Sequence, residues 1–261
     1  MSDSTNFEGV LMSDAAHRVA RVQKIIREGT AGVTLVLDRG FSVDAGQFVM
    51  VWLPDVGERP FSVMDDHPLS LTIADIGPFS HALCSLRVDD RLWIRGPYGN
   101  GFRIEGRRHL LVAGGSGGAS LALVAKAARR QGDLVTVVLG ARTADQFLLR
   151  WRFEDLGCYL LVATDDGSEG YHGTVLDALQ SQEDIVAADM IYGCGPEPML
   201  KALAQYAQEY HVDLQVSMEA VIKCGVGVCG NCHRGDRLVC SDGPVFSGRT
   251  LSRALRMEGV F

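Results

Sequence analysis

Four cysteines near the C-terminus constrain the fold of this chain more than any other feature of its sequence. Cys224, Cys229 and Cys232 follow the spacing C-x4-C-x2-C, and Cys240 comes after seven further residues. This is the plant-type spacing for a 2Fe–2S cluster, in which each iron takes two thiolates. Residues 217–261 are too few for a core of their own, so the cluster and contacts with the rest of the chain would hold this segment together.

Three glycines, Gly225, Gly227 and Gly230, lie between these cysteines. Glycine lets backbone N–H groups approach the cluster sulfurs without a clash from a Cβ atom. Hydrogen bonds of this kind help to set the reduction potential of the cluster. Because such a cluster carries one electron at a time, the sequence predicts a protein that transfers electrons.

Zinc is the main alternative to iron at these cysteines. Cys229 and Cys232 form an acceptable half-site for zinc, but structural zinc sites usually pair two such knuckles and the second is missing. A disulfide framework is disfavoured, because the seven cysteines are an odd number and the polar start of the chain does not resemble a secretion signal. A zinc-binding, nucleotide-sensing regulator is therefore the hypothesis of a different class.

The length and charge of the chain limit its organisation and its partners. A chain of 261 residues can form two modest domains and an appendage. A formal net charge of −7 gives no support for binding nucleic acid or an anionic membrane. No apolar run approaches the roughly 20 residues that span a bilayer. We expect a cytoplasmic location, where thiols stay reduced and available to iron.

The first hundred residues predict a small antiparallel β-barrel over residues 12–103. Short β-rich runs, separated by Gly, Pro and Asp, cover residues 33–37, 47–53, 61–64, 69–74 and 91–94. A loop at residues 96–101 marks the expected boundary of this domain.

Residues 104–216 alternate apolar strands with helices, which predicts a parallel sheet. Strands are expected over residues 109–113, 134–139, 159–163 and 190–192, and helices over 119–130, 175–180 and 196–210. The predicted fold class is therefore α+β and multi-domain: an antiparallel barrel, an α/β domain with a parallel sheet, and a small C-terminal cluster segment.

A glycine-rich turn, Gly114-Gly115-Ser116-Gly117-Gly118, connects the first expected strand of the second domain to its first helix. Glycines permit close approach of a dinucleotide pyrophosphate, and the helix N-terminus offers free N–H donors. Ser120 stands where the third glycine of G-x-G-x-x-G would be, so an ordinary tight connection remains the alternative.

A flavin is needed between a nicotinamide and a one-electron cluster, because the nicotinamide gives two electrons together as a hydride. The tetrapeptide Arg59-Pro60-Phe61-Ser62 is the candidate flavin contact. Its arginine can clamp a pyrophosphate with two parallel hydrogen bonds, and its serine can reach the flavin. An ordinary strand start is the competing interpretation of this tetrapeptide.

The order of these motifs, followed by Gly193-Cys194-Gly195-Pro196 and the run Cys224–Phe246, resembles one family. The chain resembles the electron-transfer subunit of NAD-dependent (class B) dihydroorotate dehydrogenase, within the ferredoxin–NADP reductase superfamily. The resemblance extends from about Ala15 to Phe246 and is most specific in the cysteine segment.

The resemblance implies three cofactors and the residues that contact them. Contacts with FAD are expected from Arg59, Pro60, Phe61, Ser62, Leu71, Thr72, Ile73, Gly77 and Ser80. Contacts with NAD(H) are expected from Gly114, Gly115, Ser116, Gly117, Gly118 and Gly195, with Cys194 as the catalytic residue beside the nicotinamide. The ligands of the 2Fe–2S cluster would be Cys224, Cys229, Cys232 and Cys240.

The resemblance also implies a partner, an FMN-containing catalytic subunit that oxidises dihydroorotate to orotate in pyrimidine biosynthesis, assembled as a heterotetramer. The gap between Cys232 and Cys240 is shorter than in many bacterial members and resembles archaeal-type members. It also resembles subunits of anaerobic sulfite reductases and certain hydrogenases, which are the alternative partners. NADPH remains an alternative to NADH because Arg142 could accept a 2′-phosphate.

Overall fold

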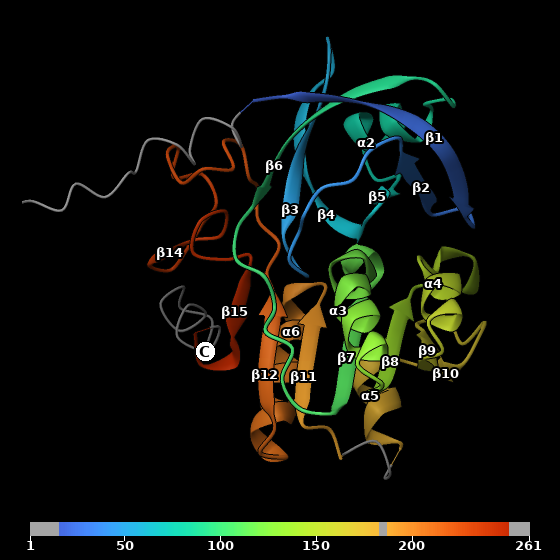
Figure 1. The fold of residues 1–261 in the computed structure, drawn as a ribbon. Coiled ribbons are helices and arrows are strands. Elements are labelled where there is room, and N and C mark those ends of the chain that lie inside the picture. Colours follow the sequence, from blue (N-terminus) through green and yellow to red (C-terminus); the bar gives the residue numbers. More distant parts are fainter. Residues whose placement is uncertain (1–15, 183–186, 251–261) are drawn as a thin grey trace, which may run out of the picture.

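Six antiparallel strands close into a barrel in the computed structural model, which describes residues 16–182 and 187–250 (Figure 1). They follow the order β1-β2-β5-β4-β3-β6, and pairing of β1 with β6 closes the ring. The strands are β1 (Arg18–Glu28), β2 (Gly32–Leu37), β3 (Phe48–Leu53), β4 (Gly57–Asp66), β5 (Leu69–Ala74) and β6 (Arg91–Tyr98). Their inward side chains are fully buried aliphatic residues, including Val33, Leu35 and Leu71.

The second domain is a mainly parallel sheet in the order β10-β9-β8-β7-β11-β12-β15. Its parallel strands are β7 (Arg108–Gly114), β8 (Leu134–Ala141), β9 (Tyr159–Thr164), β10 (Tyr171–His172), β11 (Met190–Cys194) and β12 (Asp213–Ser217). The central strand β7 is an unbroken buried run from His109 to Ala113, as expected when both faces of a sheet are covered.

Helices cover both faces of this sheet. On one face α3 (Gly118–Arg130) and α4 (Arg150–Asp155) pack against Leu111, Val137 and Tyr192. On the other face α5 (Val175–Gln180) and α6 (Glu197–Glu209) pack against Leu110 and Ile191. Short 3-10 turns, η1 (Gly115–Gly117) and η2 (Ala144–Gln146), complete the connections of this domain. In the described part of the chain, no helix combines the length and apolar character that crossing a bilayer requires.

The cysteine segment lies beside both domains and contributes a strand to the sheet (Figure 1). It contains the short hairpin β13 (His233–Arg234) and β14 (Arg237–Leu238), followed by β15 (Val245–Ser247). β15 runs antiparallel to β12 and becomes the edge of the sheet. Asn100, just after the barrel, donates hydrogen bonds from its side chain to the backbone carbonyls of Ser241 and Asp242.

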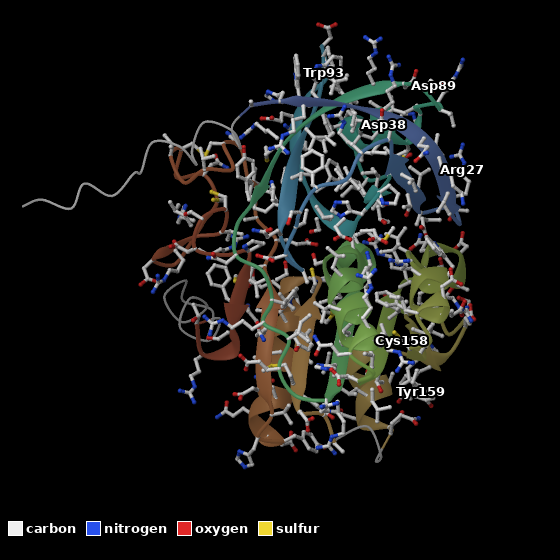
Figure 2. All side chains as sticks on the ribbon, in the orientation of Figure 1. Arg27, Asp38, Asp89, Trp93, Cys158 and Tyr159 are labelled. Atoms are coloured by element: carbon white, nitrogen blue, oxygen red, sulfur yellow. The ribbon has the colours of Figure 1, made fainter. Side chains whose placement is uncertain are left out.

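The predicted fold class is confirmed in each of its parts. The boundaries 12–103, 104–216 and 217–261 stay a prediction, and their ends at 12–15 and 251–261 lie outside the described residues. Sequence reasoning missed β1, which carries charged residues such as Arg27 on its exposed side. Figure 2 shows Arg27, Asp38 and Asp89 on the outer surface of the barrel.

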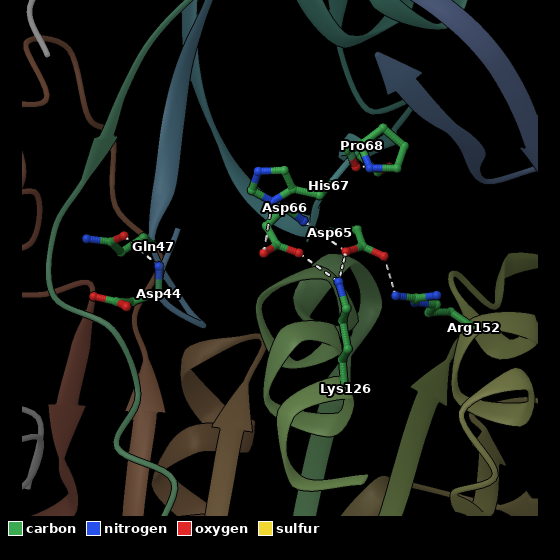
Figure 3. Close-up of polar contacts among 9 residues, drawn as sticks. Asp44, Gln47, Asp65, Asp66, His67, Pro68, Lys126 and Arg152 are labelled. Carbon is green, nitrogen blue, oxygen red and sulfur yellow. Dashed lines mark hydrogen bonds and ion pairs between the residues drawn. The ribbon is translucent and has the colours of Figure 1, made fainter. Parts of the chain in front are cut away.

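An ion cluster joins the barrel to the second domain (Figure 3). Lys126 on α3 donates to Asp65 at 2.5 Å and to Asp66 at 2.7 Å, and Arg152 on α4 donates to Asp65. Burial raises the pKa of Asp66, but hydrogen bonds with Lys126, His67 and Asp65 together outweigh burial and hold that pKa well below its usual range. The end of β4 is thereby tied to two helices of the neighbouring domain.

Candidate functional site

A pocket of ≈ 610 Å³ lies between the barrel and the carboxyl ends of the parallel strands. Its walls come from β4, β5, α2 (Pro78–Cys84), the start of α3, the end of β11 and the residues after β12. Among the residues expected to bind cofactors, the walls include Arg59, Pro60, Phe61, Ser62, Thr72, Gly77, Ser80, Ser116 and Cys194. The structure thus brings the barrel motif, the glycine turn and Cys194 to one place.

Other expected contact residues do not line this pocket. Leu71 and Ile73 are fully buried in the barrel core, on either side of Thr72. The glycines Gly114, Gly115, Gly117, Gly118 and Gly195 are also absent from its walls. Gly117 is instead a point of close approach, because a Cβ atom there would lie 2.1 Å from the carbonyl oxygen of Cys194. Cofactor contacts of all these residues stay predictions.

The pocket lies at the point where the strand order of the sheet reverses. β7 pairs with β8 on one side and with β11 on the other, so the chain winds outward in both directions from this place. Ligands of open α/β sheets bind at the carboxyl ends of strands beside such a switch point. Gly114 ends β7 and Cys194 ends β11, so both flank this position.

A hydrogen-bonded chain crosses from the second domain to the barrel at the pocket wall. Cys194 is 2% exposed, and burial raises the pKa of its thiol to about 11, so the thiol keeps its proton at neutral pH. Its S–H lies 3.4 Å from the hydroxyl of Ser120, which donates at 2.9 Å to the hydroxyl of Ser62. Ser120 was noted in the sequence only as a replaced glycine, although its place in the first turn after the glycine loop could have marked it as a site residue.

The rim of the pocket combines a cation with aromatic rings. The guanidinium of Arg59 is exposed and lies 5.8 Å from the centre of the Phe79 ring, which stacks on Phe61 at 6.1 Å. An exposed guanidinium can receive a pyrophosphate in a bidentate manner, and the aromatic wall suits a flat ring system. These residues fit FAD.

Ser80 is engaged within its own helix. Its hydroxyl accepts hydrogen bonds from the N–H groups of Ile76 and Gly77 and donates to the carbonyl of Gly77, so it stabilises the start of α2. Contact of Ser80 and Gly77 with the FAD phosphates stays a prediction.

The four cysteines of the C-terminal segment lie in two pairs. The side chain of Cys224 interacts with that of Cys229, and the side chain of Cys240 interacts with that of Cys232. Among the described residues, no three His, Cys, Asp or Glu side chains surround a single metal position. Two thiol pairs are what a 2Fe–2S cluster requires, because each of its irons takes two thiolates.

Backbone N–H groups point at the sulfurs of these pairs. The N–H of Gly227 donates to Cys240 Sγ at 3.2 Å, and the N–H of Cys240 donates to Cys232 Sγ at 3.4 Å. Gly227 has a φ of +76°, a conformation that glycine adopts without strain. The segment therefore fits a cluster whose sulfurs accept backbone hydrogen bonds.

The thiols of the two pairs differ in acidity. Burial raises the pKa of Cys224, but N–H groups of Cys229, Val226 and Val228 outweigh it and lower that pKa to about 6. Burial and the neighbouring Cys232 raise the pKa of Cys240 to about 12. Because thiolates are the metal ligands, Cys224 is ready to bind, whereas binding at Cys240 must release a proton.

Arg95 on β6 connects the flavin-side strand to the cysteine loop. Its side chain is 12% exposed and donates two hydrogen bonds of 2.7 Å to Glu58, the residue before Arg59. It also donates to the backbone carbonyl of Cys224 at 2.8 Å. Sequence reasoning missed Arg95, because its partners lie 37 and 129 residues away in the chain.

Two family models match the chain at the places where the site residues lie. Residues 219–252 match the iron–sulfur cluster binding domain of dihydroorotate dehydrogenase B. Residues 111–205 match the oxidoreductase NAD-binding domain. The iron–sulfur and NAD(H) parts of the cofactor prediction are confirmed by these matches.

Curated relatives match over most of their length. A protein of Methanocaldococcus jannaschii is 39% identical over 89% of this chain and 90% of its own length. A protein of Thermococcus kodakarensis is 42% identical over 79% of this chain and 85% of its own length. Both are named as probable electron transfer subunits of dihydroorotate dehydrogenase B (NAD(+)).

Solved structures show the same architecture. A chain from the NADH-dependent reduced ferredoxin-NADP oxidoreductase, described in connection with flavin-based electron bifurcation, has a TM-score of 0.80 at 29% identity. The match covers 94% of this chain and 95% of that one. The ferredoxin reductase of carbazole 1,9a-dioxygenase has a TM-score of 0.64 at 24% identity, over 76% of this chain and 66% of its own, and shows the fold alone.

Proposed function

The chain belongs to the family of electron transfer subunits of dihydroorotate dehydrogenase B, and from this premise we propose its reaction and its partner. It passes electrons between NAD(H) and a separate catalytic subunit through FAD and a 2Fe–2S cluster. The partner oxidises dihydroorotate to orotate in pyrimidine biosynthesis. The chain itself is the oxidoreductase subunit that reacts with the nicotinamide.

The contact made by Arg95 carries this proposal. One side chain holds both the strand that supplies Arg59 to the pocket and the carbonyl of the first cluster cysteine. The flavin pocket and the thiol pairs therefore belong to one connected part of the molecule, as transfer of electrons from one to the other requires. A zinc-binding regulator would have no need of a pocket wall tied to its metal loop.

The residues of the chain have separate tasks in this scheme. We assign Arg59 to the FAD pyrophosphate, and Ser62 with Thr72 to the wall that orients the flavin. When bound, FAD accepts a hydride as two electrons and a proton and gives up the electrons singly. Cys194 and Ser120 hold the nicotinamide-side wall without charge, because a protonated thiol and a hydroxyl line it. Cys224, Cys229, Cys232 and Cys240 hold the cluster.

The partner is a catalytic subunit that contains FMN, in a heterotetramer with two copies of each chain. We also propose a cytoplasmic location, where thiols remain reduced and can bind iron. NADH is the preferred nicotinamide in this proposal, as in the names of the relatives.

Anaerobic reconstitution with FAD, iron and sulfide tests the cofactor assignments. The loaded chain should show flavin absorbance with a broad cluster shoulder, and NADH should bleach both. Cys229→Ser should lose the cluster signal in absorbance and electron paramagnetic resonance but keep FAD that NADH reduces. Cys158→Ser is the matched control, because Cys158 precedes β9 in the second domain, away from the cysteine segment (Figure 2). A zinc-containing, colourless protein would contradict the proposal.

Co-expression with neighbouring genes tests the partner. Co-purification with an FMN enzyme, and production of orotate from dihydroorotate with NAD+ only when both chains are present, would support the assignment. Co-purification with a sirohaem or nickel–iron enzyme would assign the chain to a sulfite reductase or a hydrogenase instead.

A further inference from the structure

A buried carboxylate lies at the end of β1, where the barrel meets the second domain (Figure 1). Glu28 is 3% exposed and receives hydrogen bonds from the hydroxyl of Thr34 at 2.6 Å, the indole N–H of Trp151 at 2.9 Å and the backbone N–H of Leu149 at 2.9 Å. Indole and backbone N–H groups can only donate. An ionised carboxylate accepts from all three partners and needs no proton of its own.

The carboxylate fixes the direction of the next hydrogen bonds. Thr34 is 0% exposed, and its oxygen lies 2.8 Å from the hydroxyl oxygen of Thr72. A threonine hydroxyl has one proton, and that of Thr34 goes to Glu28. The proton between the two threonines therefore belongs to Thr72. The hydroxyl of Thr72 therefore donates its only proton to Thr34, and Thr72 lines the pocket as a hydrogen-bond acceptor alone.

We propose that Glu28 is a positioning residue, which acts through Thr34 to hold Thr72 as a hydrogen-bond acceptor for an N–H or O–H group of the bound flavin. The inference rests on the proposed function, in which this pocket holds FAD. FAD offers donors of both kinds, on its ring and on its ribityl chain. Glu28, Thr34 and Thr72 together thus favour a hydrogen-bond donor of the ligand at this point of the pocket wall and disfavour an acceptor there.

The surroundings of Glu28 show why the donor and acceptor roles of Thr34 and Thr72 are fixed and cannot be exchanged. Leu149 has a φ of +62°, a left-handed conformation that is strained for a leucine, and its N–H donates to Glu28. The other oxygen of the carboxylate serves Trp151 and Thr34. Reversal of the hydrogen bonds from Thr72 through Thr34 to Glu28 would require a proton on the Glu28 carboxylate, which already accepts from two N–H groups. These polar groups are buried between the barrel and the second domain, where each needs a hydrogen-bond partner to offset its loss of contact with water.

Titration of the FAD-free protein with FAD, followed by flavin fluorescence, tests the proposal. Thr72→Val removes the acceptor and should weaken FAD binding roughly tenfold, as expected for a ligand donor left without a partner. Thr34→Val does not touch the pocket, yet it should weaken binding several-fold, because the proton of Thr72 is released to face the ligand. Thr34→Ser keeps the hydroxyl that donates to Glu28 and accepts from Thr72, so this variant should bind FAD like the unaltered protein. Thr136→Val, in β8, is the matched control and should also leave binding unchanged.

The double variant Thr34→Val/Thr72→Val separates a positioning role from loss of structure. If Thr34 acts only through Thr72, the double variant should bind FAD no more weakly than Thr72→Val alone. Additive losses, or a Thr34→Val affinity within twofold of the unaltered protein, would overturn the inference. Glu28→Ala tests the far end of this arrangement, because it removes the acceptor of the Thr34 proton, and it should weaken binding only while Thr72 is present. Thr34→Ala gives the same comparison if Thr34→Val proves too unstable. Failure of the unaltered protein to bind FAD would instead overturn the proposed function, and this inference with it.

Discussion

Arg95 lies on β6 with most of its side chain removed from solvent, and its guanidinium contacts both the barrel and the cysteine loop. It pairs with Glu58, which also accepts from His17 at 2.9 Å. Breaking a buried ion pair by removing one partner costs more than the pair contributes, because the remaining charge stays without a counter-ion. The contacts of this one residue connect β6 with β4 and with the cysteine loop, and the spacing of these segments in the sequence does not predict that they meet.

Arg95→Met should therefore lower the free energy of unfolding by roughly 2–4 kcal/mol, since Glu58 loses its two hydrogen bonds to Arg95 and keeps only His17, and the Cys224 carbonyl loses its donor. Urea unfolding of the loaded protein under anaerobic conditions measures the change. Arg108→Met is the matched control. Arg108 pairs with Asp189 at 51% and 31% exposure, so its loss should cost less than about 1 kcal/mol. Equal losses in the two variants would contradict the structural role of Arg95.

The acidity of Glu58 predicts a dependence of stability on pH. Burial raises the pKa of Glu58, but hydrogen bonds from Arg95 and His17 outweigh burial and leave that pKa below its usual 4.5. A carboxyl with a lower pKa in the folded state stabilises the fold above its unfolded pKa, and this contribution is lost as pH falls through the folded value. The free energy of unfolding should decrease below about pH 4.5, and less steeply in Glu58→Gln. Parallel pH profiles of the two proteins would show that Glu58 makes no such contribution.

The helices and strands of both domains were largely predictable from the sequence, because apolar periodicity is a local signal. The helix expected over 119–130 is α3 (Gly118–Arg130), and the strand expected over 69–74 is β5 (Leu69–Ala74). β1 and α2 were missed, one because charges interrupt its alternation and the other because Pro78 begins a short helix inside a strand-rich region. The pairing of β15 with β12 depends on contacts distant in sequence, so no local pattern predicts it.

The same limits apply to the site. The resemblance implied that Arg59 and Ser62 contact FAD and that Cys194 lies beside the nicotinamide; all three line one pocket, and their cofactor contacts stay predictions. The buried residues Thr34 and Glu28 carry no sequence signal beyond their residue types, and Ser120 is marked only by its place after the glycine loop. Their orientation follows from the packing of two domains, which the sequence pattern of either domain does not contain.

The glycine turn gives a prediction at the scale of these elements. Gly117→Ala should disrupt the contact between the start of α3 and the end of β11, because its Cβ would lie 2.1 Å from the Cys194 carbonyl oxygen. We expect NADH affinity to fall by at least about tenfold, consistent with a displaced helix N-terminus. Gly118→Ala is the control in the neighbouring position, where a Cβ meets nothing nearer than 3.6 Å. Isothermal titration of both variants with NADH makes the comparison, and equal affinities would contradict it.

The whole molecule consists of two domains with cores of their own and a cysteine segment that rests on both. Its loop touches the barrel through Arg95 and Asn100, and its last described strand extends the sheet. The loop is too small to bury a core, so the bound cluster contributes much of its order.

Removal of iron should therefore loosen one part of the molecule selectively. Amide hydrogen exchange in residues 224–242 should accelerate by about a hundredfold or more, corresponding to a loss of at least about 2.7 kcal/mol of local protection. Exchange in β7 and β11 should change little, because these strands lie inside the buried sheet. Mass spectrometry of peptides from the loaded and iron-free protein measures both. Uniform acceleration across the barrel and the sheet would contradict a separable cysteine segment.

β15 has a consequence for the life of the chain before iron arrives. As the outermost strand beside β12, it covers the backbone N–H and C=O groups of Gln215, Val216 and Ser217. A newly made copy whose loop has not yet closed around metal leaves that row open, and open rows of this kind pair with other copies or attract proteases. We therefore expect iron supply to influence the solubility and lifetime of this protein as well as its colour, with less of the polypeptide present in a cell that is short of iron.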